Sequence, residues 1–434
     1  MKVLQRVGLL FFPAFDWSLG ASHPEREERL LYTRDQIMEE GIMDLPQFKV
    51  YAPILADKKD IQRTHALLPQ PDLHLTPPHR IAAGGAITLA KAIMAGEVKR
   101  GFALVRPPGH HAMHTVYGNR GFCTINNAAV TVNYLRSKHG IKRIAIVDTD
   151  VHHGDGTQDV FYHDPDVLFI SIHQDGRTLY PGTGFPGERG GPQAFGQTLN
   201  IPLPPETGDK GLLYVLEELV LPALEEFKPE LIINSAGQDN HYTDPLANMN
   251  ISAHGYGDLT RLIKPDLAVL EGGYAIESAL PYVNLAILLA MAGLDYTGIK
   301  EEVPPPIESV SIRELKPLIQ AMKASKGNRP SPQEWYDSDR TIFYDTEHLL
   351  ERRIEKIRGC SQCSGLHLTY TGAAANPRPK VDNLVIRLPF GVCAGCRRQA
   401  EKSLIEARNS GSWRTIYWQD QAEDEFVYHT GEKF

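Results

Sequence analysis

The sequence predicts an α/β protein in which helices cover both faces of a central parallel β-sheet, followed by a small C-terminal unit. Up to about residue 300, short runs rich in valine, isoleucine and leucine alternate with longer segments of helical periodicity. These runs do not alternate with polar residues, which is typical of strands buried on both faces. After residue 300 the composition changes, and two Cys-x-x-Cys pairs lie near the end of the chain.

Five apolar runs are predicted to form the central strands: 101–105 (GFALV), 143–147 (RIAIV), 166–172 (DVLFISI), 230–234 (ELIIN) and 266–270 (DLAVL). The intervening helices include residues 82–97, 126–140 and 210–227, where apolar residues recur every three or four positions. The apolar run before Pro13 is interpreted as a first strand and not as a signal peptide, because Pro13 and Asp16 interrupt it early.

Composition excludes several classes of protein. The chain has 434 residues, 42% of them hydrophobic, and a net charge of −8, so nothing in the overall balance indicates a protein that binds nucleic acid or a membrane surface. The longest apolar segment, LAILLAMAGL, is shorter than the roughly 18 residues that span a bilayer. The uneven distribution of the five cysteines favours a reducing compartment, and the cytoplasm is expected.

A domain boundary is predicted near residue 303, where the sequence reads EEVPPPIESV. We expect a catalytic domain over 1–300, a connecting segment over 301–358 and a cysteine module over 359–434. The sequence does not decide whether the chain forms a homo-oligomer.

Polar groups follow each of the five predicted strands, and in a parallel sheet these groups meet in the crevice at the carboxyl ends of the strands. In chain order they are His110 and His111, the run that begins at Asp148, Ser171 with His173, Asp239, and Tyr274.

The segment after the second strand has the pattern of a metal site. In extended backbone, Asp148, Asp150 and His152 project to one side. Two of these residues together with Asp239 make an Asp-His-Asp set with a fourth position open, as in catalytic zinc sites. Zinc lowers the pKa of bound water to near 7, which supplies a nucleophile at neutral pH.

In these motifs the chain resembles the histone deacetylase superfamily, which includes acetoin-utilisation proteins and acetylpolyamine amidohydrolases. The matching motifs, in the family's order, are HPEREERL, RPPGHH, GFCTINNAAV, DTDVHHGDGTQDVF, ISIH, YPGTG, AGQDNHYTDPL and LEGGY, and they cover roughly residues 20–290. The resemblance implies a three-layer arginase/deacetylase-like fold around a central parallel sheet.

The resemblance also implies a role for each residue of the site. Zn2+ would be bound by Asp150, His152 and Asp239. His110 would pair with Asp148 and His111 with Asp155, and one of the two histidines would act as general base and then as general acid. We favour His111, but the sequence leaves the choice open. Tyr274 would donate a hydrogen bond to the oxyanion of the tetrahedral intermediate.

Two further sets of residues follow from the resemblance. Gly121, Phe122 and Tyr180 match a narrow tunnel that receives an acyl-amine chain, with Leu246 at the gatekeeper position. A structural potassium ion is expected from the pattern at Asp148, Asp150, His152, Ser171 and the carbonyl of Ile172.

The chain departs from many relatives at two places. Gln238 and Asn240 flank Asp239, a change expected to affect the surroundings of the metal without removing it. Leu246 stands where polyamine-selective relatives have an acidic residue, which tilts the prediction modestly toward an acyl-lysine substrate.

The four C-terminal cysteines predict a second, structural zinc site in a zinc-ribbon-like module. Cys360 and Cys363 are separated from Cys393 and Cys396 by 29 residues, and four thiolates close a tetrahedral shell. Redox-active cysteine pairs and coincidental thiols are the alternatives. The segment 383–396 (NLVIRLPFGVCAGC) is predicted to be a strand that leads into the second pair.

Three functions therefore compete. The first is a zinc-dependent amidohydrolase that deacylates lysine in proteins or peptides. The second is an acetylpolyamine amidohydrolase with the same chemistry and a different tunnel mouth. The third is a non-catalytic acyl-lysine-binding scaffold that acts through the cysteine module; the presence of His110, His111 and Tyr274 argues against it.

Overall fold

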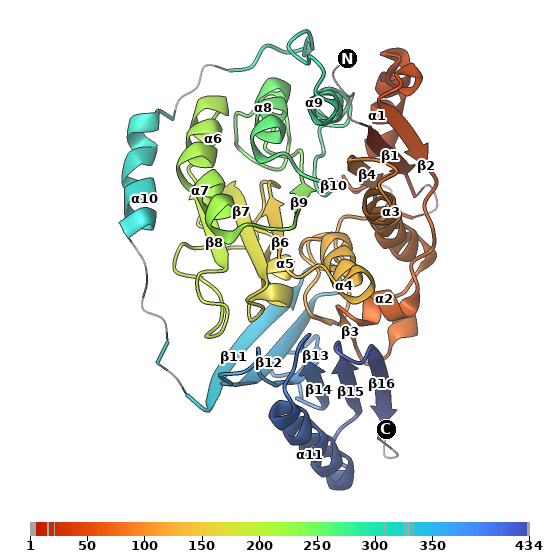
Figure 1. The fold of residues 1–434 in the computed structure, drawn as a ribbon, viewed down its shortest axis with the longest axis vertical. Coiled ribbons are helices and arrows are strands. Elements are labelled where there is room, and N and C mark those ends of the chain that lie inside the picture. Colours follow the sequence, from red (N-terminus) through yellow and green to blue (C-terminus); the bar gives the residue numbers. More distant parts are fainter. Residues whose placement is uncertain are drawn as a thin grey trace.

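The structure is a computed structural model that describes residues 6–14, 17–20, 22–306, 310–324, 327, 330–331 and 333–431. It contains an eight-stranded sheet with helices on both faces and a separate six-stranded sheet in the C-terminal part (Figure 1). Among the described residues, no helix is long and apolar enough to cross a membrane.

All neighbouring strands of the eight-stranded sheet are parallel. In spatial order they are β2 (Phe48–Tyr51), β1 (Val7–Phe12), β4 (Arg100–Val105), β10 (Leu267–Leu270), β9 (Leu231–Ala236), β6 (Ile144–Asp148), β7 (Val167–Gln174) and β8 (Thr198–Leu203). This confirms the predicted parallel sheet and all five central strands, and β1 confirms the strand predicted before Pro13. The edge strands β2 and β8 were not predicted.

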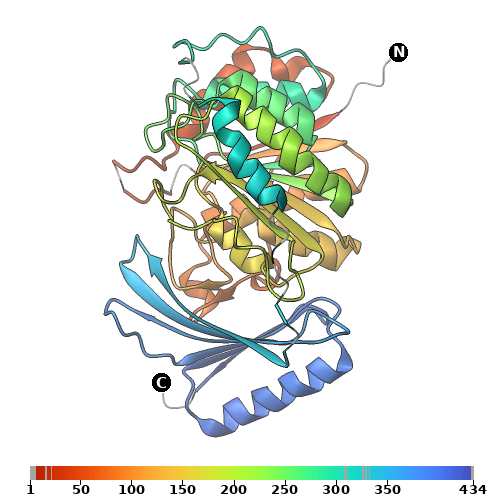
Figure 2. The same cartoon turned by 90° about the vertical axis from the view of Figure 1, so that its left-hand side faces the viewer.

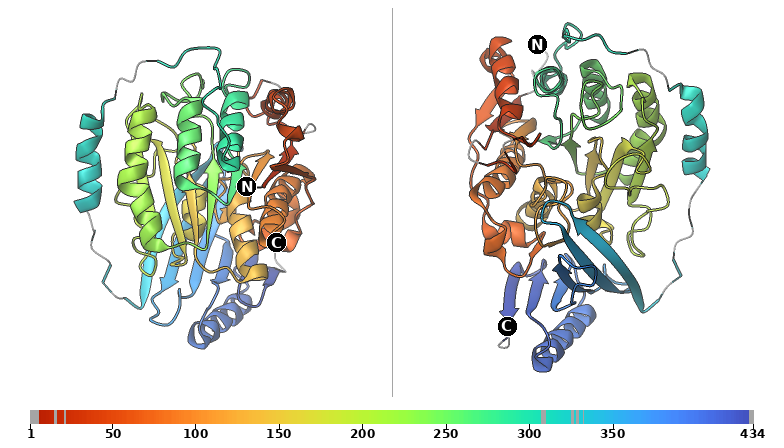
Figure 3. Two further views of the ribbon diagram at one scale, coloured as in Figure 1. Left: turned by 45° about the horizontal axis from the view of Figure 1, so that its top comes forward. Right: turned by 180° about the vertical axis from the view of Figure 1, so that it is seen from behind.

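Helices cover both faces of this sheet (Figure 3). One face is covered by α3 (Pro77–Met94), α4 (Asn127–His139) and α5 (Asp155–Phe161), with α2 (Lys58–Gln62) against α4. The other is covered by α1 (Glu28–Glu39), α6 (Asp209–Val215), a π-helical turn (Leu216–Val220), α7 (Leu221–Phe227), α8 (Ala253–Ile263), α9 (Leu280–Ala292) and, outermost, α10 (Ile312–Ala324). Two 3-10 turns (Ile42–Asp44, Pro71–Leu73) and a short ladder of β3 (Ala66–Leu67) with β5 (Thr115–Val116) complete this part.

Strand β6 shows why the strand sequences are continuously apolar. Its residues Ala145 and Val147 belong to the core with α1, α6, α8 and α9, whereas Ile144 and Ile146 belong to the core with α3 and α4. Successive side chains of a strand point to opposite faces, so a sheet covered on both sides needs apolar residues at every position. Burial therefore continues to the strand's carboxyl end, where Asp148 is fully buried.

The C-terminal sheet is larger than the ribbon expected from the cysteines. Its strands, in spatial order, are β11 (Trp335–Tyr344), β12 (Leu349–Arg358), β13 (His367–Ala374), β14 (Asn383–Leu388), β15 (Thr415–Asp420) and β16 (Glu425–Thr430). Only β14 and β15 are parallel, and α11 (Ala394–Ser410) connects them. The predicted boundary at 359 is therefore corrected, because β11 and β12, placed in the connecting segment 301–358, pair with the strands of this sheet.

The middle strands of this sheet, β14 and β15, are buried on both faces. Helix α11 packs on the outer face against Leu384, Ile386 and Trp418, while the inner face lies on the catalytic part of the chain (Figure 2). On the inner face, Val385 and Tyr417 pack with residues of β3.

A buried charge network joins the two sheets. Arg353 of β12 is fully buried and bonds the carboxylates of Asp159 (2.7 Å) and Glu351 (2.9 Å) and the hydroxyl of Thr115. Although burial opposes it, Arg353 and Arg340 lower the pKa of Asp159. A buried carboxylate is tolerated only with such a partner, so the network binds the C-terminal sheet to α5.

Arg353→Met is expected to lower the free energy of unfolding by about 3–5 kcal/mol, because it leaves Asp159 and Glu351 buried without their main cation. Arg352→Met is the matched control: its side chain is 49% exposed and pairs with Asp339, and exposed ion pairs contribute little to stability, so its loss should leave the free energy of unfolding nearly unchanged. Urea unfolding followed by tryptophan fluorescence measures both, since three of the four tryptophans (Trp335, Trp413, Trp418) lie in the C-terminal part. Equal effects would contradict the assignment.

Candidate active site

The carboxyl ends of five parallel strands surround a cavity of about 270 Å3. It is lined by Pro108, His110, His111, Gly121, Phe122, His152, Leu179, Tyr180, Leu246, Tyr274 and Asp345. The structure thus brings together the two histidines after β4, Tyr274 after β10, and the four residues predicted for the tunnel. Asp345 comes from the C-terminal sheet.

The Asp-His-Asp set lies at one end of this group. One ligand atom from each of Asp150, His152 and Asp239 lies within 4.8 Å of the others, and His152 Nδ1 is 3.1 Å from both Asp150 Oδ1 and Asp239 Oδ2. The remaining carboxylate oxygens accept backbone hydrogen bonds, Asp150 Oδ2 from Gly272 (2.7 Å) and Asp239 Oδ1 from Val151 (2.9 Å). Both carboxylates are fully buried.

This donor set fits a divalent cation. Two buried carboxylates beside one imidazole leave uncompensated negative charge, which is costly unless a cation binds. Two carboxylate oxygens and one imidazole nitrogen are ligands that zinc uses in open sites. Gly237 and Gly272 leave room for the set, because a methyl group at either position would overlap a carboxylate oxygen of Asp150 or Asp239.

The residues predicted to hold potassium lie beside this set on two adjacent strands. Asp148 of β6 and Ser171 of β7 are register partners, and Ile172 follows on β7. Asp148 Oδ1 accepts the backbone N–H of Asp150 (3.1 Å), and the Ser171 hydroxyl is 2.8 Å from His173 Nδ1. Potassium itself stays a prediction.

The two histidines that line the cavity each pair with a carboxylate. His110 Nδ1 is 3.1 Å from Asp148 Oδ2, and His111 Nδ1 is 2.8 Å from Asp155 Oδ1. The second nitrogens differ: His110 Nε2 lies 3.6 Å from Asp150 Oδ1, whereas no described protein atom hydrogen-bonds His111 Nε2.

The surroundings shift the two imidazoles in opposite directions. Burial favours the neutral form of His110, but the carboxylates of Asp150 and Asp148 outweigh it and raise the pKa of His110 well above its ordinary value. Burial, reinforced by His110 and Arg120, holds the pKa of His111 well below its ordinary value.

Tyr274 is fixed from three sides. Its ring packs edge-on against Phe122 at 5.6 Å, the guanidinium of Arg29 lies 4.8 Å from the ring centroid, and Asp244 Oδ2 accepts its backbone N–H at 2.6 Å. Burial raises the pKa of Tyr274 well above its ordinary value. The phenol therefore stays protonated and is available as a hydrogen-bond donor.

Three residues of the site were missed by sequence reasoning. Glu271 is fully buried, and its Oε2 accepts the backbone N–H groups of Gly109 (2.6 Å) and His110 (3.0 Å), which fixes the histidine segment. Burial raises the pKa of Glu271 to about 7. Arg120 pairs with Asp155 at 2.6 Å behind His111. Glu271 lies within the motif LEGGY and Arg120 directly precedes the motif GFCTINNAAV, so these motifs could have indicated both residues.

The third missed residue, Asp345, carried no such signal. It lies in the turn between β11 and β12, and its Oδ1 accepts the backbone N–H of Gly121 at 2.9 Å and faces the Tyr180 hydroxyl at 3.4 Å. The contact joins residues 224 positions apart.

Three residues that adjoin the Asp150–His152–Asp239 set in the sequence form hydrogen bonds with residues outside that set. His153 is buried and links Thr183 (2.8 Å) to Gln158 (3.1 Å). The side chain of Asn240 donates to the carbonyl of Thr149, and that of Gln238 donates to Asn284.

Comparison with known proteins agrees with this geometry. The family model described as "Histone deacetylase domain" matches residues 72–289. The chain belongs to the histone deacetylase family. A "Probable deacetylase" of Archaeoglobus fulgidus is 45% identical over 307 residues, which cover 64% of this chain and 84% of that protein.

Other members of the histone deacetylase family match less of their own length. "Histone deacetylase 14, chloroplastic" of Arabidopsis thaliana is 40% identical over 56% of this chain and 60% of that protein. The "Histone deacetylase-like amidohydrolase" of Pseudomonas aeruginosa is 37% identical over 50% of this chain and 58% of that protein. The crystal structure of the HDA15 HD domain superposes with a TM-score of 0.62 at 28% identity, covering 74% of this chain and 98% of that one. These relatives support a hydrolase that acts on amides.

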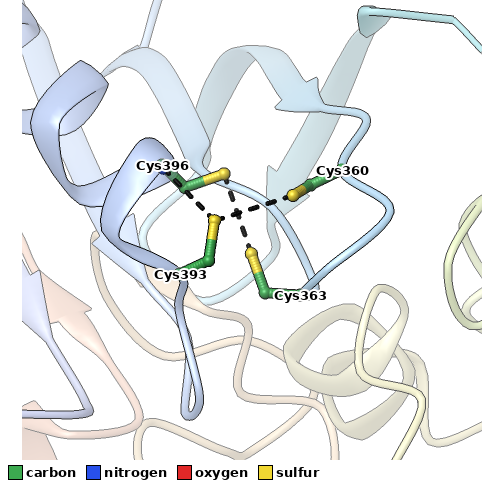
Figure 4. A group of neighbouring side chains, drawn as sticks. All are labelled: Cys360, Cys363, Cys393 and Cys396. Atoms are coloured by element: carbon green, nitrogen blue, oxygen red, sulfur yellow. Dashed lines mark hydrogen bonds between the residues drawn. The ribbon is translucent and has the colours of Figure 1, made fainter.

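The four-cysteine cluster lies outside the residues matched by the histone deacetylase domain. Cys360 and Cys363 follow β12, Cys393 precedes the first residue of α11, and Cys396 lies in its first turn. The Sγ atoms of Cys360 and Cys393, and those of Cys363 and Cys396, are 3.7 Å apart (Figure 4). A tetrahedral ZnS4 site with bonds of about 2.3 Å has edges of about 3.8 Å, whereas a disulfide needs about 2.05 Å. The cluster therefore fits a structural zinc site. The backbone N–H of Cys396 lowers the pKa of Cys393 to about 7, which favours the thiolate.

Cys363→Ser is expected to remove about one zinc per chain and to lower the unfolding midpoint of the C-terminal sheet, because the metal joins β12 to α11. Elemental analysis and thermal unfolding measure the two effects. Cys123→Ser provides the control, since Cys123 is buried beside the catalytic cavity and bonds the carbonyl of Gly121; its loss should leave zinc at the cluster unchanged. An unchanged metal content in Cys363→Ser would exclude the site.

Proposed function

We propose that the protein is a zinc-dependent deacylase that hydrolyses the amide of an acyl-lysine in proteins or peptides. One observation carries this proposal: His110, His111, His152 and Tyr274 line one cavity, and each of the three histidines contacts a buried aspartate, with Asp150 and Asp239 completing the set around His152. Residues 1–300 are the proposed catalytic unit. The thiols of the cysteine cluster favour a reducing compartment such as the cytoplasm.

Asp150, His152 and Asp239 would hold the zinc ion, which when bound polarises a carbonyl and activates water at neutral pH. His111 is the proposed general base, because Asp155 fixes its Nδ1 and leaves Nε2 without a described protein partner. The same nitrogen would return the proton to the leaving amine. Tyr274 would donate its phenolic hydrogen to the oxyanion that develops on the acyl carbon. A potassium ion held by Asp148, Asp150, His152, Ser171 and the carbonyl of Ile172 would offset the negative charge of the two carboxylates.

A specific observation favours a second candidate, an acylpolyamine amidohydrolase. Asp345 places a carboxylate in the wall of the cavity, although the gatekeeper position holds Leu246. Both candidates share the reaction and differ in what the mouth of the tunnel binds. The third candidate, a non-catalytic scaffold, predicts zinc at the cysteine cluster alone.

The purified protein is expected to bind about two zinc ions per chain, one at each ligand set. Asp150→Ala should reduce this to about one and abolish hydrolysis of acetyl-lysine peptides, since it removes a ligand to the catalytic ion. Elemental analysis and an acetate-release assay give both readouts. Zinc at the cysteines alone in the unmodified protein would favour the scaffold, and full activity of Asp150→Ala would refute the proposal.

Tyr274→Phe is expected to lower kcat about 10²–10³-fold with zinc content unchanged, because it removes one donor to the oxyanion and keeps the ring between Phe122 and Arg29. Steady-state kinetics on an acetyl-lysine peptide measures the change. A rise in KM without a fall in kcat would assign Tyr274 to substrate binding instead.

A further inference from the structure

The turn between β11 and β12 forms part of the tunnel wall. The backbone carbonyl of Phe343 accepts from Arg120 Nε (3.1 Å), Asp345 accepts from Gly121 N–H (2.9 Å), and Glu347 accepts from Asn119 N–H (2.8 Å). The end of β11 and the turn after it thus bond three consecutive residues of the loop that carries Gly121. The C-terminal sheet holds this loop in place and adds one side chain, that of Asp345, to the lining of the cavity.

The carboxylate of Asp345 is oriented by hydrogen bonds but has no ion-pair partner among the described residues. Oδ1 receives the Gly121 N–H and faces the Tyr180 hydroxyl, whereas Oδ2 accepts no hydrogen bond from the residues that the structure describes. The nearby cation, Arg120, is already engaged by Asp155 and by the carbonyl of Phe343. No lysine or arginine of the described chain forms an ion pair with Asp345, which is partly exposed.

Much of the remaining lining of the cavity is apolar or aromatic. Leu179, Leu246 and Phe122 line it together with Asp345, the histidines and Tyr274. Such a wall suits a methylene chain that ends in a group complementary to a carboxylate. Carboxylates accept hydrogen bonds only, and an unneutralised one in a partly desolvated pocket prefers a cation to a neutral amide.

We propose that Asp345 is a specificity-determining residue that binds a positively charged nitrogen lying beyond the scissile amide of the substrate. The proposal rests on the proposed amidohydrolase function and names its substrate class: acylated amines that carry a second cationic group. That group would be the free ammonium of an acylated diamine or a basic residue next to an acyl-lysine. A part of the chain outside the histone deacetylase domain would thus select the substrate.

Two matched pairs of substrates test this with the full-length, zinc-loaded protein. N-acetylputrescine and N-butylacetamide have the same four-carbon chain and differ in the terminal ammonium. Two acetyl-lysine peptides differ only in an arginine or a glutamine beside the acetyl-lysine. We expect Asp345→Asn, which retains an oxygen for the Gly121 N–H, to lower kcat/KM about tenfold for the cationic member of at least one pair. The neutral members should change less than about twofold. The pair that responds identifies the source of the cation.

Asp339→Asn is the control, because this exposed carboxylate of the same sheet lies outside the cavity and pairs with Arg352; it should change neither pair. In the unmodified protein, raising the salt from about 0.05 M to about 0.5 M should reduce kcat/KM for the preferred cationic substrate alone, since salt screens charges. Equal losses on charged and neutral substrates, or no loss, would overturn the role of Asp345 and leave the proposed function intact. If the unmodified protein hydrolyses none of the four substrates, the proposed function itself fails.

Discussion

Two carboxylates, those of Asp150 and Asp239, lie fully buried around a single imidazole, and their need for compensating charge organises the rest of the catalytic site. Backbone N–H groups of Gly272 and Val151 hold one oxygen of each and leave the other toward His152. Glycine is required at 237 and 272 because a side chain would occupy the space of the carboxylates. A cation is the remaining partner that such an arrangement needs. The strands that carry its ligands, β6 and β9, end side by side at this edge of the sheet.

The same rule acts at the interface between the two sheets, where it is satisfied within the protein. Arg353 neutralises Asp159 and Glu351 in a site without access to water. Asp159 belongs to α5, which begins at Asp155, the partner of His111. The C-terminal sheet is therefore bonded to the helix that carries the carboxylate partner of His111, and it also bonds the loop of Gly121.

The part of the chain that carries the candidate active site was predictable for two reasons. Strands buried on both faces need apolar residues at every position, which is easily recognised in a sequence, and the motifs of the site are short and local. The edge strand β2 lacks that pattern, since its two central residues, Lys49 and Val50, are exposed. In β11, six of ten residues are exposed, including Asp337, Ser338 and Asp339, so the run resembles a linker. Asp345 was beyond prediction for another reason: its position in the cavity depends on a contact across 224 residues, and no local pattern encodes it.

The position of Asp345 separates the chemistry of this protein from its selectivity. The groups proposed to break the amide bond lie within residues 72–289, the part that the histone deacetylase domain matches, whereas the carboxylate at the tunnel wall is carried by a sheet that begins at Trp335. Relatives that share the first part can thus diverge in substrate range without any change near the metal, by gaining, losing or altering an appended sheet. In such a chain the reaction and the choice of substrate can evolve independently of each other.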